Sequence, residues 1–170
     1  MGSVAYAGAG APVPADSPCA GEQAAHRGKF LVRGDASNTI YGTPYRDVII
    51  AGGGNDIVHA REGDDIVCGG HGNDRLFGNR GFDGVWGEAG ADRINGGPAA
   101  DDAYGGSGDD SLAGGRGDDA LFGEGDDDWL GDAPGDDLLH AGPERDHDTC
   151  ALFHEGGRDR TRDCELYEVE

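Results

Sequence analysis

The sequence is poor in positive charge and in long apolar runs. Only 13 of its 170 residues are Lys or Arg, against 34 Asp or Glu, which gives a net charge of −21. Such strong acidity argues against partners such as nucleic acid or an anionic membrane surface. No stretch is long and apolar enough to predict a membrane-spanning helix. The first 18 residues also lack the basic start and the apolar segment of an intact signal peptide.

Motifs typical of catalytic sites are missing as well. The six histidines form no His-Glu-x-x-His pair, and there is no Gly-x-Ser-x-Gly elbow and no phosphate-binding glycine loop. The four cysteines include no Cys-x-x-Cys spacing, which disfavours zinc and thioredoxin-like chemistry. Adjacent acids such as Asp109 and Asp110 look like catalytic pairs, but they recur from loop to loop as part of a repeat. The sequence therefore predicts a protein that is not an enzyme.

What the sequence has instead is glycine and aspartate at fixed intervals. Residues 42–149 divide without a gap into twelve nonapeptides, such as GGSGDDSLA at 105–113. The sixth position is Asp in all twelve: Asp47, Asp56, Asp65, Asp74, Asp83, Asp92, Asp101, Asp110, Asp119, Asp128, Asp137 and Asp146. The eighth position is apolar in eleven: Ile49, Val58, Val67, Leu76, Val85, Ile94, Ala103, Leu112, Leu121, Leu130 and Leu139. Only Asp148 interrupts that second row.

Each position of the nonapeptide has a physical reason. Glycine at positions one, two and four permits turns with positive φ and a close approach of carbonyl oxygens. The sixth-position Asp adds a carboxylate oxygen, and oxygen-only ligands suit Ca²⁺, which accepts about six to eight of them. The last three residues favour a short strand whose middle side chain points inward. With two nonapeptides per coil, the sequence predicts an all-β, right-handed parallel β-roll, a β-helix solenoid of about six coils with calcium in the turns.

The nonapeptides resemble the repeats-in-toxin (RTX) family, whose pattern is Gly-Gly-x-Gly-x-Asp-x-aliphatic-x, over roughly residues 33–149. In that family the sixth-position Asp and nearby loop carbonyls bind calcium, so the resemblance implies that the twelve aspartates above are metal ligands. Five gaps between six loops on each side of the roll would hold up to about ten ions, and their charge would nearly cancel that of the chain. The fourth position departs from Gly at Tyr45, Ala99, Asp126 and Glu144.

The segments outside the repeats are expected to close the ends of the roll, as solenoids require. We expect a flexible arm at residues 1–18, an N-terminal cap at 19–41, the calcium-binding roll at 42–149 and a C-terminal cap at 150–170. The N-terminal cap includes a degenerate first repeat, because Asn38 and Ile40 fit its sixth and eighth positions.

The four cysteines lie where they would fasten these caps. Cys150 and Cys164 bracket the C-terminal cap, and Cys68 has an outward-facing ninth position that Cys19 of the N-terminal cap would reach. We therefore expect the pairs Cys19–Cys68 and Cys150–Cys164, which is similar to the arrangement in secreted actinobacterial calcium-binding repeat proteins that the chain resembles. Disulfides indicate an oxidising compartment outside the cell. Four free thiols in a reducing compartment are the alternative.

Aromatic residues recur at eighteen-residue spacing on one outer face, at Trp86, Tyr104 and Phe122. Strands about 4.8 Å apart would stack these rings as a ladder. Such a face would bind an extracellular protein or glycan, or it would only stiffen the sheet.

One inward aliphatic residue in nine makes a thin core, so we expect folding and calcium binding to be one event. The sequence predicts a secreted calcium-binding protein with a structural or binding role outside the cell. The alternative is a noncatalytic module that helps a larger secreted enzyme to fold and to be exported in a calcium-dependent way. The oligomeric state and the biological process are left open.

Overall fold

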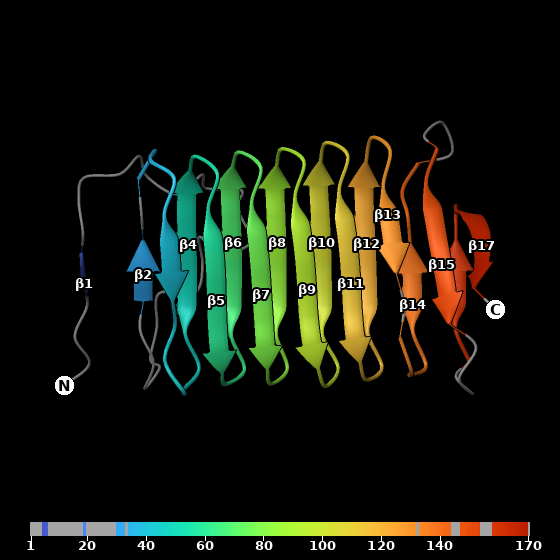
Figure 1. Ribbon diagram of the computed structural model, residues 1–170, viewed down its shortest axis with the longest axis horizontal. Helices are drawn as coiled ribbons and strands as arrows, with labels where there is room; N and C mark the ends of the chain where they lie inside the picture. The colour runs from blue at the N-terminus through green and yellow to red at the C-terminus, as the bar shows by residue number, and fades with distance from the viewer. Residues whose placement is uncertain are drawn as a thin grey trace.

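In the computed structural model, successive strands from β2 onward alternate between two parallel sheets (Figure 1). The structure describes residues 5–6, 19, 30–32, 34–131, 133–143, 147–153 and 158–169. The first sheet contains, in spatial order, β1 (Ala5–Tyr6), β2 (Phe30–Val32), β4 (Val48–Gly53), β6 (Ile66–His71), β8 (Gly84–Ala89), β10 (Asp102–Ser107), β12 (Ala120–Gly125), β14 (Leu138–His140) and β16 (Arg160–Arg162). The second sheet contains β3 (Thr39–Tyr41), β5 (Ile57–Glu62), β7 (Arg75–Arg80), β9 (Arg93–Pro98), β11 (Ser111–Arg116), β13 (Trp129–Gly131), β15 (Thr149–Phe153) and β17 (Glu165–Val169). In this described part of the chain, no helix has the length and apolar character needed to cross a membrane.

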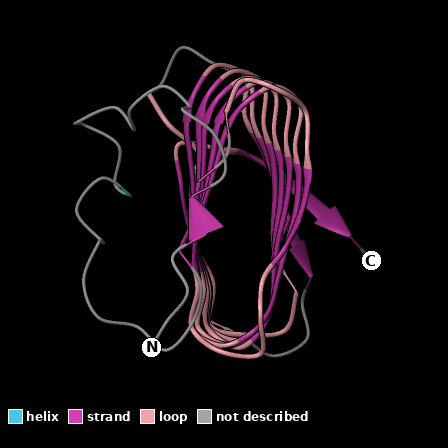
Figure 2. Cartoon of the chain, turned by 90° about the vertical axis from the view of Figure 1, so that its left-hand side faces the viewer, coloured by secondary structure: helices cyan, strands magenta, loops and turns pink. Residues whose placement is uncertain are grey.

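From β2 to β14, neighbouring strands in each sheet are one coil, or eighteen residues, apart. In the first sheet Val67 pairs with Val85, and Val85 pairs with Ala103. In the second sheet Leu76 pairs with Ile94 in the same way. The chain is therefore an all-β parallel solenoid of about six coils, as the sequence predicts. Seen along the roll, the coils superimpose as a flattened oval with a row of loops at each end (Figure 2).

The strands are longer than the three residues predicted from the repeat. The strands from β4 to β12 have six residues each, from the seventh position of one nonapeptide to the third position of the next. Adjacent coils have the same backbone conformation, so their glycine segments continue to pair, as Gly52 does with Gly70. The turns are therefore confined to positions four to six, and each loop packs directly against the loop of the next coil.

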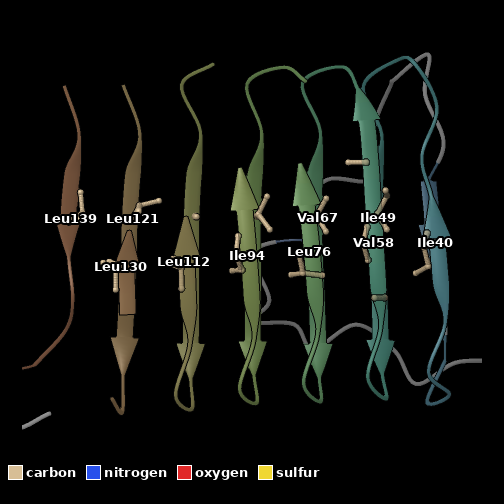
Figure 3. Packing of buried hydrophobic residues seen from close by; sticks show 14 of the residues in the cluster. Ile40, Ile49, Val58, Val67, Leu76, Ile94, Leu112, Leu121, Leu130 and Leu139 are labelled. Carbon is tan, nitrogen blue, oxygen red and sulfur yellow. The ribbon is translucent and has the colours of Figure 1, made fainter. Parts of the chain in front are cut away.

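The core is a single column of aliphatic side chains between the two sheets (Figure 3). All eleven apolar eighth-position residues are at most 2% exposed, as predicted. Ile40 extends the column at one end and Cys150 at the other. Each coil contributes only two eighth-position side chains, so burial of apolar surface stabilises each coil modestly.

Both ends of the roll continue the sheets. At the N-terminal end, the Asn38 carbonyl accepts the N–H of Ile57, and Ile40 is 1% exposed, so residues 34–41 have the conformation of a repeat. At the C-terminal end, β16 and β17 pair in parallel with β14 and β15, so the predicted C-terminal cap adds a strand to each sheet. Of the predicted arm at residues 1–18, only Ala5–Tyr6 lies within the described residues, as a strand paired with β2.

Two disulfides join the predicted pairs of cysteines. Cys19 and Cys68 are linked on the outer face of the first sheet, where both are fully buried and pack with Ile50 and Trp86. Cys150 is linked to Cys164 at the C-terminal end of the core column. The disulfides therefore lie toward the two ends of the roll, one at β6 and one at β15.

The predicted aromatic row is confirmed on the first sheet. The ring centroids of Trp86 and Tyr104 are 5.2 Å apart and those of Tyr104 and Phe122 are 4.8 Å apart, with interplanar angles of 2° and 7°. A second stacked row, which the sequence did not predict, lies on the second sheet and contains Tyr41, His59 and Phe77. Both rows join neighbouring coils on their outer faces.

Candidate metal centre

The sixth-position aspartates form two buried rows, one along each edge of the roll. Those that precede strands of the first sheet are Asp47, Asp65, Asp83, Asp101, Asp119 and Asp137. Those that precede strands of the second sheet are Asp56, Asp74, Asp92, Asp110 and Asp128. Each of these eleven side chains belongs to a residue that is at most 3% exposed. Aspartate is rarely buried to this degree unless it is paired, so the rows need partners.

One carboxylate oxygen of these aspartates binds the preceding coil. The backbone N–H of Asp74 donates to Oδ1 of Asp92, and the N–H of Asp92 donates to Oδ1 of Asp110, both over 2.7 Å. The same contact recurs along both rows. The carbonyl of Asp74 also accepts the N–H of Arg93. Each aspartate therefore joins adjacent coils through its main chain and through Oδ1.

The second carboxylate oxygen has no hydrogen-bond donor in ten of these residues. The buried Oδ2 atoms without a partner belong to Asp56, Asp65, Asp74, Asp83, Asp92, Asp101, Asp110, Asp119, Asp128 and Asp137. A buried carboxylate oxygen that loses its water without gaining a partner is destabilising. Its recurrence at ten equivalent places makes these atoms candidate ligands for a cation.

Burial raises the pKa of these carboxyls. The pKa is about 8 for Asp65 and Asp110 and about 6 for Asp83 and Asp92. It is about 7 for Asp74, Asp101, Asp119 and Asp128, and the pKa of Asp56 is also raised. Loss of hydration is the largest cause in every case, and the backbone N–H bonded to the carboxylate opposes it. A cation beside Oδ2 would favour the ionised form and lower these pKa values.

The first-position glycines border the space in front of Oδ2. A Cβ atom on Gly78 would lie 2.5 Å from Asp83 Oδ2 and 2.7 Å from the Gly96 carbonyl oxygen. A carboxylate oxygen and a carbonyl oxygen of the next coil therefore converge beside this glycine. In the described ranges no group of three or more His, Cys, Asp or Glu side chains is placed to hold a metal ion, so backbone carbonyls would have to supply most ligands of a cation here. Such a set of oxygens fits a hard divalent cation, and Ca²⁺ best.

The backbone at the second and fourth positions separates two kinds of loop. The nine loops that begin between Ala51 and Gly123 have positive φ at both positions. This includes the predicted departures Ala99 and Asp126, with φ of 119° and 75°. Tyr45, another departure from glycine, differs: in its loop, which begins at Gly42, neither Thr43 nor Tyr45 has positive φ. The fourth, Glu144, lies outside the described residues.

The predicted register does not hold in the last repeat. The N–H of Asp128 donates to Oδ1 of Asp148, twenty residues along the chain, where the other contacts span eighteen. Asp148 therefore takes the sixth-position place, and the core residue that follows it is Cys150. Asp146, which the nine-residue count places in the row, lies outside the part of the chain that the structure describes. The next contact joins the N–H of Asp137 to Oδ1 of Asp159.

The fifth-position polar residues form a separate, exposed ladder. Asp109 Oδ1 accepts the N–H of Asp127 over 3.3 Å, and Asp118 Oδ1 accepts the N–H of Asp136 over 3.0 Å. The two members of the Asp109 and Asp110 pair therefore have different contacts. The sixth-position acid lies in the buried row, and the fifth-position acid bonds the next coil at the surface.

A comparison with protein families agrees with this repeat. A family model described as RTX calcium-binding nonapeptide repeat (4 copies) matches residues 33–67, 69–103 and 96–130, which together make up more than half of the chain. No curated protein sequence matches the chain.

Replacing Ala99 by Gly should stabilise the roll. A φ of 119° is strained for Ala and normal for Gly, so we expect the free energy of unfolding to rise by about 1 kcal/mol. Ala100→Gly is the matched control, because Ala100 has no positive φ and the same change there should destabilise by about 0.5–1 kcal/mol. Denaturant unfolding of both variants with calcium present measures the difference. Equal effects would contradict the strain at Ala99.

The raised pKa values predict that acid stabilises the calcium-free roll. These carboxyls bind protons more tightly in the folded state than in the unfolded state, whose pKa is near 3.8. Their stabilising contribution is complete below about pH 4 and is lost as the pH rises through about 6–8. Far-UV circular dichroism of protein dialysed free of calcium should therefore show more β-structure near pH 5 than near pH 8. With limiting calcium the trend should reverse, since protons compete with the cation. More β-structure at the higher pH without calcium would contradict the expectation.

Proposed function

Because the chain belongs to the RTX calcium-binding nonapeptide repeat family, we propose that it folds around calcium ions held by its two aspartate rows. The observation that carries this proposal is the set of ten buried Oδ2 atoms without a hydrogen-bond donor. Each would give one ligand to an ion, and loop carbonyls such as that of Gly96 would give others. The number of ions would then be up to about ten.

Charge supports coupling between calcium binding and folding. The chain has a net charge of −21. Eleven sixth-position carboxylates are buried in two rows, and successive carboxylates in each row are one coil apart. Bound calcium supplies the positive charge that these carboxylates need in order to stay ionised. Without it, the aspartates repel one another or take up protons, and the thin core column offsets little of that cost. Folding and binding are therefore one event.

The two disulfides support a location outside the cell. Cys19–Cys68 and Cys150–Cys164 pair all four cysteines of the chain. Such bonds persist in oxidising compartments, where calcium is also plentiful enough to fill many weak sites. The protein is then a secreted structural or binding protein whose roll forms only after it leaves the cell.

The aromatic row of the first sheet supports a structural role better than glycan binding. Trp86, Tyr104 and Phe122 stack face to face, so each inner ring face is covered by the next ring. The rings present mainly their edges to solvent, whereas a sugar ring packs on an open aromatic face. The row therefore stiffens the sheet that connects the coils.

A pair of isosteric variants tests the calcium ligands. Asp110→Asn keeps an Oδ1 that can accept the Asp92 N–H, but it removes the charge and the anionic Oδ2. Asp109→Asn removes the same charge one residue away at an exposed position. In a calcium titration followed by circular dichroism, we expect the wild type to fold as calcium is added. The midpoint should rise at least about tenfold for Asp110→Asn and less than about twofold for Asp109→Asn.

Two results would count against the proposal. A native β-spectrum that persists in chelator at neutral pH would separate folding from calcium. Equal shifts in the two variants would mean that net charge, and not the sixth-position carboxylate, sets the affinity. Magnesium is a further control, since it prefers compact octahedral shells with bound water and should fold the chain poorly.

The proposed location is tested in the source cells. An antibody against the roll should detect the protein in the culture fluid or on the cell surface. Before reduction, none of its cysteines should react with an alkylating reagent, because all four are in disulfides. A band near 17.5 kDa is expected for a stand-alone protein. A much longer secreted band would instead support a module of a larger secreted enzyme, and a reduced cytosolic protein would overturn export.

A further inference from the structure

Asp47, at the start of the first row, differs from the ten aspartates that have an unpaired Oδ2. Its carboxylate is fully buried like the others, but Thr43 satisfies it. The backbone N–H of Thr43 donates to Asp47 Oδ2 over 2.5 Å, and the Thr43 hydroxyl lies 2.9 Å from Oδ1 and 3.0 Å from Oδ2. The second oxygen, which is unpaired in the ten aspartates, is thus bonded within the loop at Asp47.

Two features of the local sequence produce this contact. Position two of the loop is Thr43, which supplies the only hydroxyl found at this place in the repeat register. Position four is Tyr45, and neither Thr43 nor Tyr45 has the positive φ found at the equivalent places of the next nine loops. In this backbone the Thr43 N–H faces the carboxylate. The absence of positive φ is not sufficient by itself, because Ala133 and Gly135 also lack it and Asp137 Oδ2 has no donor. In those nine loops the second position has positive φ, and Oδ2 receives no such donor.

A hydrogen-bonded carboxylate of this kind is a poor cation ligand. The N–H and O–H hydrogens carry partial positive charge and already satisfy the two carboxylate oxygens. A cation would have to displace both donors and would leave the N–H of the half-buried Thr43 without its carboxylate acceptor. The gain in free energy that the ten unpaired Oδ2 atoms offer to a cation is therefore absent here.

We propose that the first loop is a metal-independent turn, in which Thr43 takes the place of the cation and Asp47 holds no calcium ion. The inference rests on the proposed calcium binding at the other aspartates. Asp47 still continues its row, because its N–H donates to Oδ1 of Asp65 over 2.7 Å. The loop also packs closely on the next coil, where a Cβ atom on Gly63 would lie 2.5 Å from the Tyr45 carbonyl carbon. The N-terminal end of the roll thus has a preformed turn on which the calcium-dependent loops stack.

Counting bound calcium ions by native mass spectrometry tests the proposal. Asp56→Asn is the matched control for Asp47→Asn, because Asp56 begins the opposite row and its Oδ2 is unpaired. We expect Asp56→Asn to bind fewer ions than the wild type and Asp47→Asn to bind the same number. The double variant Thr43→Gly with Tyr45→Gly restores the repeat pattern and frees the Asp47 carboxylate, so it should bind one ion more than the wild type.

The outcomes separate this inference from the proposed function. A wild-type protein that binds no calcium overturns both. Equal losses in Asp47→Asn and Asp56→Asn overturn only the inference, because Asp47 would then be a ligand like the rest. A folded double variant with an unchanged count also overturns it. If the double variant does not fold, as circular dichroism would show, the comparison of the two single variants decides.

Discussion

The structure depends on a carboxylate whose two oxygens have different partners. Oδ1 accepts a backbone N–H from the preceding coil, as Asp92 does from Asp74, and so sets the register between coils. Oδ2 is buried and has no hydrogen-bond donor in ten of the sixth-position aspartates. A single aspartate thus connects the packing of the sheets to the charge of the loops. A Cβ atom on Gly78 or Gly96 would lie 2.5 or 2.6 Å from Oδ2 of the aspartate in its loop, whereas Ala51 and Ala60 hold the same position ahead of Asp56 and Asp65.

The other interactions between coils surround the aspartate carboxylate, and each contributes only modestly to stability. The core column gives each coil little apolar burial, and the aromatic rows and the fifth-position ladder add contacts outside it. All of them repeat once per coil and join only nearest neighbours, as in other solenoids. No single coil is stable alone, so stability accumulates along the roll. One disulfide joins Cys19 to β6, and the other joins Cys150 of β15 to Cys164 in the last coil.

Much of the fold follows from the sequence because the period is strict. A nine-residue repeat with one aliphatic position determines the coil length and the core column, and the positions of the cysteines were enough to predict both disulfides. The satisfied Asp47 was not predictable, because it depends on the rotamer of Thr43 and on a backbone that lacks positive φ. The place of Asp148 was missed because counting in nines cannot detect extra residues in a loop. The second aromatic row was visible at the ninth positions, but His59 between Tyr41 and Phe77 obscured it.

The aspartate contacts at the C-terminal end span twenty and twenty-two residues where the earlier ones span eighteen, yet they join the same atoms. The aspartate therefore keeps its contact with the preceding coil even though more residues separate the two positions. Natural variation must therefore preserve the hydrogen bond between the aspartate Oδ1 and the preceding coil, and not the number of residues between the two positions. Insertions ahead of the aspartate are tolerated, whereas an insertion between the aspartate and the inward residue two places later would turn that side chain out of the core. A lineage of such proteins would therefore lengthen by whole coils and diversify in the loops, and its recognisable period would fade before its architecture did.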